Sequence, residues 1–217
     1  MSIFYEEDEY NGFIIDRNGI RTNPQKTKAV LDAPVPTNLK ELQRFIGAIN
    51  YYGKFIKDFA TIAKPLFTLL QKNVEYHWSK EQQSSYELLK DCLVNAPLLT
   101  MYDKRLPLKL DTDASSYGLG AVLSHVYPDG SEKPIAYASR SLNSSELKYS
   151  QVDKEGAAII FALKKFYQYL MGRHFQLVVD NKAIMRIFHP HKQMSSVAAN
   201  RLMRRSIIMA SYDYEIK

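Results

Sequence analysis

The stretch Leu108-Lys-Leu-Asp-Thr-Asp-Ala-Ser-Ser-Tyr-Gly-Leu-Gly120 decides the expected fold. Apolar and polar residues alternate from Leu108 to Asp113, which is the period-two pattern of a half-buried strand. Such a strand carries its acidic residues on one face and presents Asp113 at its carboxyl end. The glycines at 118 and 120 suit tight bends or a close backbone approach before a second strand begins.

The sequence on the C-terminal side of this stretch predicts an α/β unit. We expect strands at residues 106–113, 118–127 and 133–141, with a turn at residues 128–131. A long helix is expected at residues 151–171, and its apolar middle indicates burial. A fourth strand at residues 175–180, two helices at 181–189 and 198–211, and a fifth strand from residue 212 complete the pattern.

The upstream part reads differently, because it is mostly helical and basic. A strand at residues 9–16 and a turn at 16–19 begin it, and helices are expected at 24–31, 39–49, 62–70 and 80–96. Asn38 with Glu41, and Ser79 with Gln82, have capping-box spacing. We therefore divide the chain into residues 1–21, a helical region 22–96 and an α/β domain 97–217.

Composition limits the classes of protein. The chain has 217 residues, of which 46% are hydrophobic and 24% charged, as in an ordinary folding chain, and its net charge is +6. The basic excess fits a nucleic-acid partner without establishing one. There is no secretory signal and no long apolar run, so we expect a cytoplasmic or nuclear protein without membrane contact. The single cysteine, Cys92, is expected to be a small, buried, apolar residue on a helix and not a nucleophile.

Three carboxylates are candidates for one site. Two predicted strands end at Asp113 and Asp180, and the helix between them carries Glu155 near its start. Crowded carboxylates are costly unless a cation joins them, and hard oxygen ligands suit Mg²⁺ or Mn²⁺. Spacing alone does not select this triple, because 23 acidic residues offer many such sets, each of them consistent with a solvated or salt-bridged carboxylate.

Longer motifs surround these residues. They are Thr112-Asp-Ala-Ser-Ser-Tyr-Gly-Leu-Gly-Ala-Val-Leu-Ser124, Pro134-Ile-Ala-Tyr-Ala-Ser-Arg140, Leu147-Lys-Tyr-Ser150, Asp153-Lys-Glu155, Phe166-Tyr-Gln-Tyr-Leu-Met-Gly-Arg173 and Val179-Asp-Asn-Lys182. Together they resemble the ribonuclease H domain of reverse transcriptases from gypsy-type LTR retrotransposons. Upstream, Tyr10-Asn-Gly-Phe-Ile-Ile-Asp-Arg-Asn-Gly-Ile20 resembles the last palm strands of that family with the primer-grip turn, and residues 40–56 resemble its thumb and connection.

The resemblance implies a ribonuclease H-like mixed sheet with helices and hydrolysis of RNA in RNA–DNA hybrids. It places the first three catalytic and metal-binding acids of the family at Asp113, Glu155 and Asp180, with two Mg²⁺ or Mn²⁺ ions. It also implies that the partners are an RNA–DNA hybrid and the remainder of a Pol polyprotein. The residues that we expect to contact nucleic acid are Tyr10, Gly12, Arg140, Asn181, Lys182 and Arg201.

The chain departs from the family pattern in three ways. The polymerase aspartates have no counterpart, so we expect a fragment without polymerase activity. Asn181 stands where the family has histidine, and it donates a hydrogen bond but does not titrate. The fourth acid of the family lies beyond the fifth strand, where this chain ends. His189 and His191 lie in a predicted loop near this side.

Two alternatives remain open from sequence. The chain is either an enzyme fragment, with activity weakened by the missing fourth acid, or a degenerate remnant that only binds nucleic acid or a protein. A connection-like domain that merely positions a polymerase is a third possibility, against which the three intact acids count.

Overall fold

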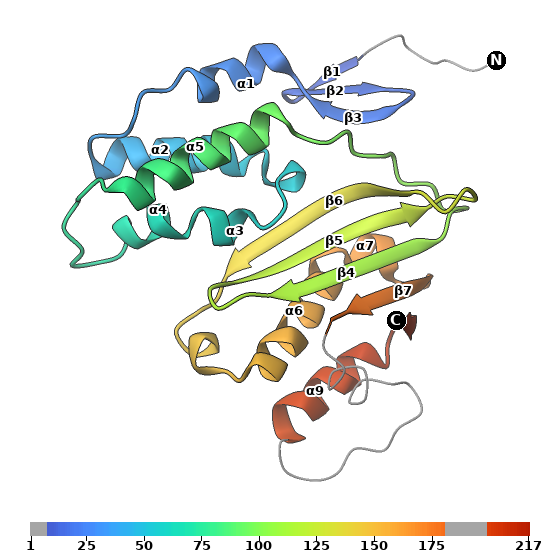
Figure 1. The fold of residues 1–217 in the computed structure, drawn as a ribbon. Helices are drawn as coiled ribbons and strands as arrows, with labels where there is room; N and C mark the ends of the chain where they lie inside the picture. The colour runs from blue at the N-terminus through green and yellow to red at the C-terminus, as the bar shows by residue number, and fades with distance from the viewer. Residues whose placement is uncertain (1–7, 181–198) are drawn as a thin grey trace.

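The computed structural model describes residues 8–180 and 199–217. A three-stranded antiparallel sheet comes first, and five α-helices and a short 3₁₀ helix follow (Figure 1). These elements are β1 (Asp8–Tyr10), β2 (Phe13–Asp16), β3 (Gly19–Thr22), α1 (Pro24–Leu31), α2 (Leu39–Asn50), η1 (Gly53–Phe55), α3 (Phe59–Ile62), α4 (Lys64–Leu69) and α5 (Lys80–Val94).

A five-stranded mixed sheet with helices forms the second part of the chain. Its elements are β4 (Leu108–Ala114), β5 (Gly118–Val126), β6 (Glu132–Ser141), η2 (Glu146–Lys148), α6 (Gln151–Lys165), α7 (Tyr167–Leu170), β7 (His174–Val179), α9 (Ala199–Met209) and β8 (Asp213–Ile216). The strand order is β6-β5-β4-β7-β8. The predicted α/β class with a mixed sheet is confirmed.

The register of this sheet places two strand ends beside each other. β4 pairs antiparallel with β5 and parallel with β7, and Thr112 lies opposite Val179. Because β4 and β7 are neighbours that run in the same direction, their carboxyl ends lie side by side at one end of the sheet. The residues that follow this pair, Asp113 and Asp180, are therefore brought to the same end.

The two faces of the sheet have different neighbours. α6 packs against β4 and β5 and covers one face, which carries a core of apolar side chains such as Leu110, Ile159 and Leu177. α3 and η1 contact β6 from the opposite side, where the helical region lies (Figure 1). That helical region has its own core, which includes Leu42, Phe55 and Leu89.

Helix caps follow the sequence signals. Asn38 Oδ1 accepts the Glu41 backbone N–H at 3.0 Å, but the Glu41 carboxylate bonds to the Thr37 N–H rather than to Asn38 itself. Ser79 and Gln82 form the reciprocal capping box at the start of α5. α1 begins and ends at the predicted residues, with Pro24 in its first turn.

Three predicted elements were wrong in detail. Residues 9–16 form two strands joined by a tight turn, with Asn11 and Gly12 in left-handed conformations, so Asn-Gly acts as a hairpin signal. The helix expected at 62–70 is divided between α3 and α4, because Pro65 cannot continue the preceding helix. The helix expected at 151–171 ends at Lys165, and α7 follows Phe166.

Candidate functional site

Asp113 lies at the carboxyl end of β4, where the strand reaches solvent. Along β4 the buried residues alternate with more exposed ones, and Asp111 and Asp113 lie on the face away from the α6 core. Asp113 is exposed, and its Oδ1 accepts the backbone N–H of Ala114 at 2.8 Å. The alternation read from the sequence is thus the feature that directs this carboxylate outward.

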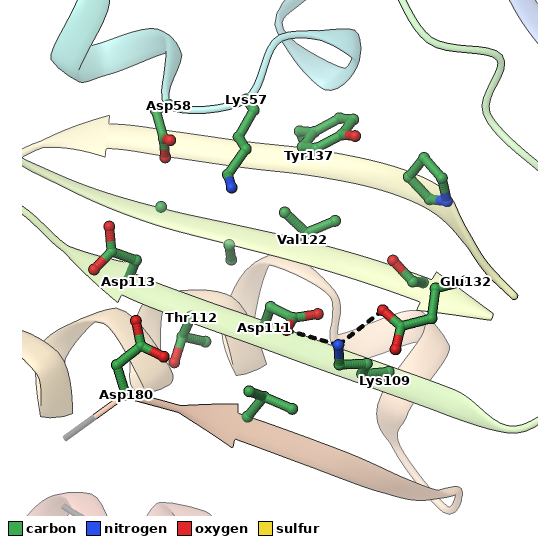
Figure 2. Close-up of a pocket in the computed structure, with 15 residues that line it drawn as sticks. Lys57, Asp58, Lys109, Asp111, Thr112, Asp113, Val122, Glu132, Tyr137 and Asp180 are labelled. Atoms are coloured by element: carbon green, nitrogen blue, oxygen red, sulfur yellow. Dashed lines mark hydrogen bonds and ion pairs between the residues drawn. The ribbon is translucent and has the colours of Figure 1, made fainter. Parts of the chain in front are cut away.

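Asp180 follows β7 directly and is also exposed. It lines the same pocket as Asp113, on the sheet face opposite α6 (Figure 2). The parallel pairing of β4 with β7 accounts for this arrangement, because it aligns the two strand ends. Asp113 and Asp180 are therefore two of the three predicted acids that the fold brings together at one surface.

Glu155 approaches the same end of the sheet from α6. Ser150 caps this helix by accepting the Asp153 N–H, and Glu155 follows in the second turn with only 7% of its surface exposed. Burial raises the pKa of the Glu155 carboxyl, and the negative charges of Asp113 and Asp180 raise it further, while a hydrogen bond from Gln151 opposes the shift. Glu155 therefore lies within electrostatic range of both Asp113 and Asp180.

The three carboxylates nevertheless do not all line one pocket. Glu155 does not line the pocket that Asp113 and Asp180 share. Across residues 8–180 and 199–217, no three Asp, Glu, His or Cys side chains gather closely enough to hold a metal ion. The arrangement therefore provides three neighbouring carboxylates without a closed coordination shell.

A fourth carboxylate lies over this pocket, and it comes from the helical region. Asp58 precedes α3 in the left-handed conformation, with φ of 55°. A Cβ added at Gly120, the strand partner of Asp113, would lie 2.6 Å from Asp58 Oδ1. Burial raises the pKa of Asp58, the positive charge of Lys57 opposes this, and the charge of Asp113 adds to it. Figure 2 shows Lys57 and Asp58 above the sheet.

Sequence reasoning missed Asp58 and did not place Lys57 at this site, because both are more than 50 residues from Asp113 and lie outside any acidic motif. Only the packing of α3 on the sheet brings them to the site. The backbone N–H of Ala60 donates to Ser139 Oγ at 3.0 Å, and Thr61 Oγ1 lies 3.1 Å from Ser115 Oγ. Gly118 and Gly120, which leave room for Thr61 and Asp58, are the local signs of this contact.

The opposite end of the pocket is neutralised by a lysine. Lys109 Nζ lies 3.1 Å from Asp111 Oδ1 and 2.8 Å from Glu132 Oε2 (Figure 2). Burial raises the pKa of Asp111, and the hydrogen bond and charge of Lys109 oppose that shift. Asp111 is therefore a paired carboxylate, which distinguishes it from Asp113 two residues later on the same face.

The residues expected to contact nucleic acid fall into separate places. Tyr10 is 64% exposed at the end of β1, and Gly12 is in the adjoining turn with φ of 76°. The Tyr51 hydroxyl donates to the Asn11 carbonyl, and Lys54 Nζ lies 3.8 Å above the Phe13 ring. This turn is therefore held by aromatic side chains of the helical region.

Arg140 makes an internal pair. Its Nη1 and Nη2 each lie 2.7 Å from an oxygen of Glu146, which is the bidentate arrangement of a strong ion pair. Arg201 belongs to α9. Asn181 and Lys182, together with His189 and His191, lie outside the described residues. A nucleic-acid role for these residues and for Tyr10 and Gly12 stays a prediction.

Comparison with known families assigns the central part of the chain. Residues 78–177 match the family described as the RNase H-like domain found in reverse transcriptase. The chain is 37% identical over 212 residues to the retrovirus-related Pol polyprotein from transposon 297 of Drosophila melanogaster, covering 97% of this chain and 19% of that protein. It is 33% identical over 211 residues to the transposon Tf2-3 polyprotein of Schizosaccharomyces pombe, covering 96% of this chain and 16% of that protein.

Solved structures share the fold at lower sequence identity. A foamy viral protease-reverse transcriptase, described as dRH and in complex with double-stranded DNA, has a TM-score of 0.77 at 22% identity and covers 98% of this chain and 38% of that chain. The foamy viral protease-reverse transcriptase in complex with RNA/DNA hybrid has a TM-score of 0.74 at 24% identity, over 97% of this chain and 28% of that chain.

The family match and the relatives agree with the colinear motifs. The chain spans about a fifth of the length of the curated relatives that it matches. Among the described residues, no helix is long and apolar enough to cross a membrane. Residues 78–177 therefore form an RNase H-like domain of the reverse-transcriptase kind, in a chain homologous to part of retrotransposon Pol polyproteins.

Proposed function

We propose that this chain is the part of a retrotransposon Pol polyprotein that hydrolyses RNA in RNA–DNA hybrids with divalent cations. The observation that carries the proposal is the position of Asp113 and Asp180, which line one pocket at neighbouring strand ends, with Glu155 linked to the same strand end through Gln151. The match of residues 78–177, which include Asp113 and Glu155, to an RNase H-like domain supports a nuclease role. A solved relative in fold was obtained with RNA/DNA hybrid, which supports that substrate class.

The donor chemistry fits the proposed cations. All three side chains offer hard oxygen ligands, which Mg²⁺ and Mn²⁺ prefer. Burial, and then the charges of Asp113 and Asp180, raise the pKa of Glu155, and a bound cation would offset the repulsion between these charges. Two ions would supply the acidity that activates water and the charge that stabilises the leaving oxygen of a phosphodiester.

The chain's own residues have distinct parts in this proposal. Asp113 and Asp180 face the pocket at the strand ends, where a phosphate group of the hybrid would lie. Glu155 approaches from α6 and is held by Gln151. Basic side chains would contact phosphates, and such contacts make binding fall with salt. The remaining Pol polyprotein and the hybrid are the proposed partners.

A second candidate is binding without cleavage. The position of Glu155 favours it, because that carboxylate does not line the pocket that Asp113 and Asp180 share. The two functions differ in one observable, because a binding remnant retains salt-sensitive affinity for the hybrid but leaves its RNA strand intact.

The test uses a hybrid with end-labelled RNA, incubated with the 217-residue chain in Mg²⁺, in Mn²⁺ and in EDTA. We expect metal-dependent cuts in the RNA of the hybrid, and none in duplex DNA or duplex RNA. Binding of the hybrid without cleavage in either metal would contradict the nuclease proposal and support the binding remnant.

A further inference from the structure

One side chain joins the strand end that carries Asp113 to the helix that carries Glu155. The Nε2 of Gln151 lies 2.7 Å from the carbonyl oxygen of Ala114 and 2.6 Å from Glu155 Oε1. Ala114 is the residue after Asp113, and its own N–H is held by Asp113 Oδ1 at 2.8 Å. A continuous set of hydrogen bonds therefore runs from one carboxylate to the other.

The direction of these hydrogen bonds follows from their chemistry. A backbone carbonyl and a carboxylate only accept hydrogen bonds, and a side-chain amide nitrogen has two hydrogens to donate. Both hydrogens of the Gln151 amide are therefore used, one for each acceptor. The helix also favours this geometry, because Gln151 and Glu155 are four residues apart on the same face of α6.

We propose that Gln151 is a positioning residue that fixes the Glu155 carboxylate relative to Asp113, so that the pair is arranged before a divalent cation binds. The inference rests on the proposed function. Gln151 is itself exposed, so its side chain contributes little to the core, whereas Glu155 is buried. Without the amide, a buried carboxylate loses its hydrogen bond and α6 loses its link to the strand end.

A purely structural link would give a different result from a positioning residue. Loss of a structural link lowers stability and leaves metal affinity unchanged in the folded protein. Loss of a positioning residue weakens metal binding while the chain stays folded, because the ligands must then be arranged at the moment of binding. Partners that orient metal ligands in this way typically change metal affinity by about 10–100-fold.

The experiment measures Mn²⁺ binding to the 217-residue chain by isothermal titration calorimetry, without nucleic acid, together with thermal unfolding. Gln151→Met removes both donors and keeps the length of the side chain. Gln168→Met is the matched control, because Gln168 is exposed on α7. We expect Gln151→Met to weaken Mn²⁺ binding by about 10-fold. Gln168→Met is expected to bind as the unchanged chain does.

A second variant separates the lost donors from the new apolar group. Gln151→Asn keeps the amide but is one methylene too short to reach both acceptors, so we expect it to weaken Mn²⁺ binding as well. A loss confined to Gln151→Met, or a Gln151→Met chain that binds Mn²⁺ like the unchanged one, would overturn the inference.

Failure of the proposed function gives a distinct result. If the unchanged chain binds no Mn²⁺, the proposed function and this inference both fail. If the unchanged chain binds Mn²⁺ and cleaves the hybrid, but Gln151→Met does both equally well, the proposed function stands and Gln151 has no positioning role.

Discussion

At the scale of single residues, the carboxylate of Glu155 is the clearest case of a side chain whose environment opposes its charged form. It is buried beside two other acids, and both effects raise its pKa above the ordinary value of 4.5. A carboxyl with a raised folded-state pKa stabilises the fold when protonated, and this contribution is lost as the pH rises through that pKa. Without metal, Glu155 therefore contributes less stability at pH 7 than it does below pH 4.5.

Glu155→Gln should accordingly raise the thermal unfolding midpoint at pH 7 in EDTA. The amide keeps an oxygen for the Gln151 hydrogen bond and removes the charge. The gain should shrink towards zero as the pH falls below about 4.5, where the carboxyl is protonated in both folded and unfolded states. Thermal melts across this pH range check the prediction, and an unchanged or lower midpoint at pH 7 would contradict it.

The ion pair of Arg140 with Glu146 changes stability with pH in the opposite direction to Glu155. The hydrogen bonds and charge of Arg140 lower the pKa of Glu146 below 4.5, while burial opposes this, so the pair stabilises the fold above the ordinary pKa and loses that effect as the pH falls through the lowered one. Glu146→Gln should cost roughly 1–3 kcal/mol of unfolding free energy at pH 7. The difference from the unchanged chain should fade as the pH falls from 4.5 through the lowered pKa of Glu146.

Urea unfolding at pH 7 and at lower pH measures this difference. Glu132→Gln is the control, because Glu132 is exposed and an exposed pair contributes about 0–1 kcal/mol. Equal losses from the two substitutions would show that the Arg140 pair is no stronger than a surface contact.

The sequence predicted where the three candidate acids lie in the fold, and it missed neighbouring residues for a physical reason. Alternation along residues 108–113 and the strand at 175–180 placed Asp113 and Asp180 at strand ends, and the apolar middle of the long helix placed Glu155 against the sheet. Asp58 and Gln151 were missed because their roles depend on contacts with Gly120 and Ala114, which no local pattern records.

At the scale of elements, local chemistry explains some boundaries and tertiary packing explains others. Pro65 accounts for the break between α3 and α4. No glycine or proline occurs between residues 157 and 171, yet α6 ends at Lys165. Phe166, which precedes α7, and Leu170, the last residue of α7, are both buried in the core of the sheet. We attribute this break to packing, which sequence periodicity alone does not reveal.

The turn after β2 joins the small sheet to the rest of the molecule. Gly19 has φ of 144°, and a Cβ there would lie 2.1 Å from the backbone carbonyl oxygen of Leu99. The next residue, Ile20, exchanges two backbone hydrogen bonds with Leu99, at 2.7 and 2.9 Å. The glycine is therefore required both by its backbone conformation and by the close approach of another segment.

Gly19→Ala should lower the unfolding free energy by at least roughly 1–3 kcal/mol, the usual cost of such a backbone conformation for a residue with a side chain. The control is Gly47→Ala in α2, where an added Cβ meets nothing within 4 Å and helix propensity favours alanine. Urea unfolding compares the two. A Gly19→Ala chain as stable as Gly47→Ala would contradict the close approach.

At the scale of the whole molecule, the helical region and the mixed sheet are joined by direct contacts. Ala60 and Thr61 of α3 bond to Ser139 and Ser115 of the sheet region, and Tyr137 of β6 packs against the helical core. The family match begins at residue 78, inside the helical region. The domain boundary that we placed at residue 97 stays a prediction. The regions on its two sides are in direct contact.

The two regions should therefore unfold together. Trp78 is the single tryptophan and packs on the helical core, so its fluorescence reports that region. Hydrogen exchange of the amides in β4 and β5 reports the sheet. We expect both probes to give the same urea midpoint, because small packed chains unfold cooperatively. A tryptophan transition well below that of the sheet would show two independent units.

The central claim concerns the whole site, and a comparison of two aspartates on one strand tests it most directly. Asp113 and Asp111 lie two residues apart on the same face of β4, but Asp111 is paired with Lys109. Mg²⁺-dependent cleavage of labelled RNA in an RNA–DNA hybrid should fall by at least about 100-fold in Asp113→Asn, since a lost ligand disables metal-ion catalysis. It should stay within about threefold in Asp111→Asn, because that carboxylate holds no proposed cation. Equal cleavage by Asp113→Asn and the unchanged chain would contradict the account.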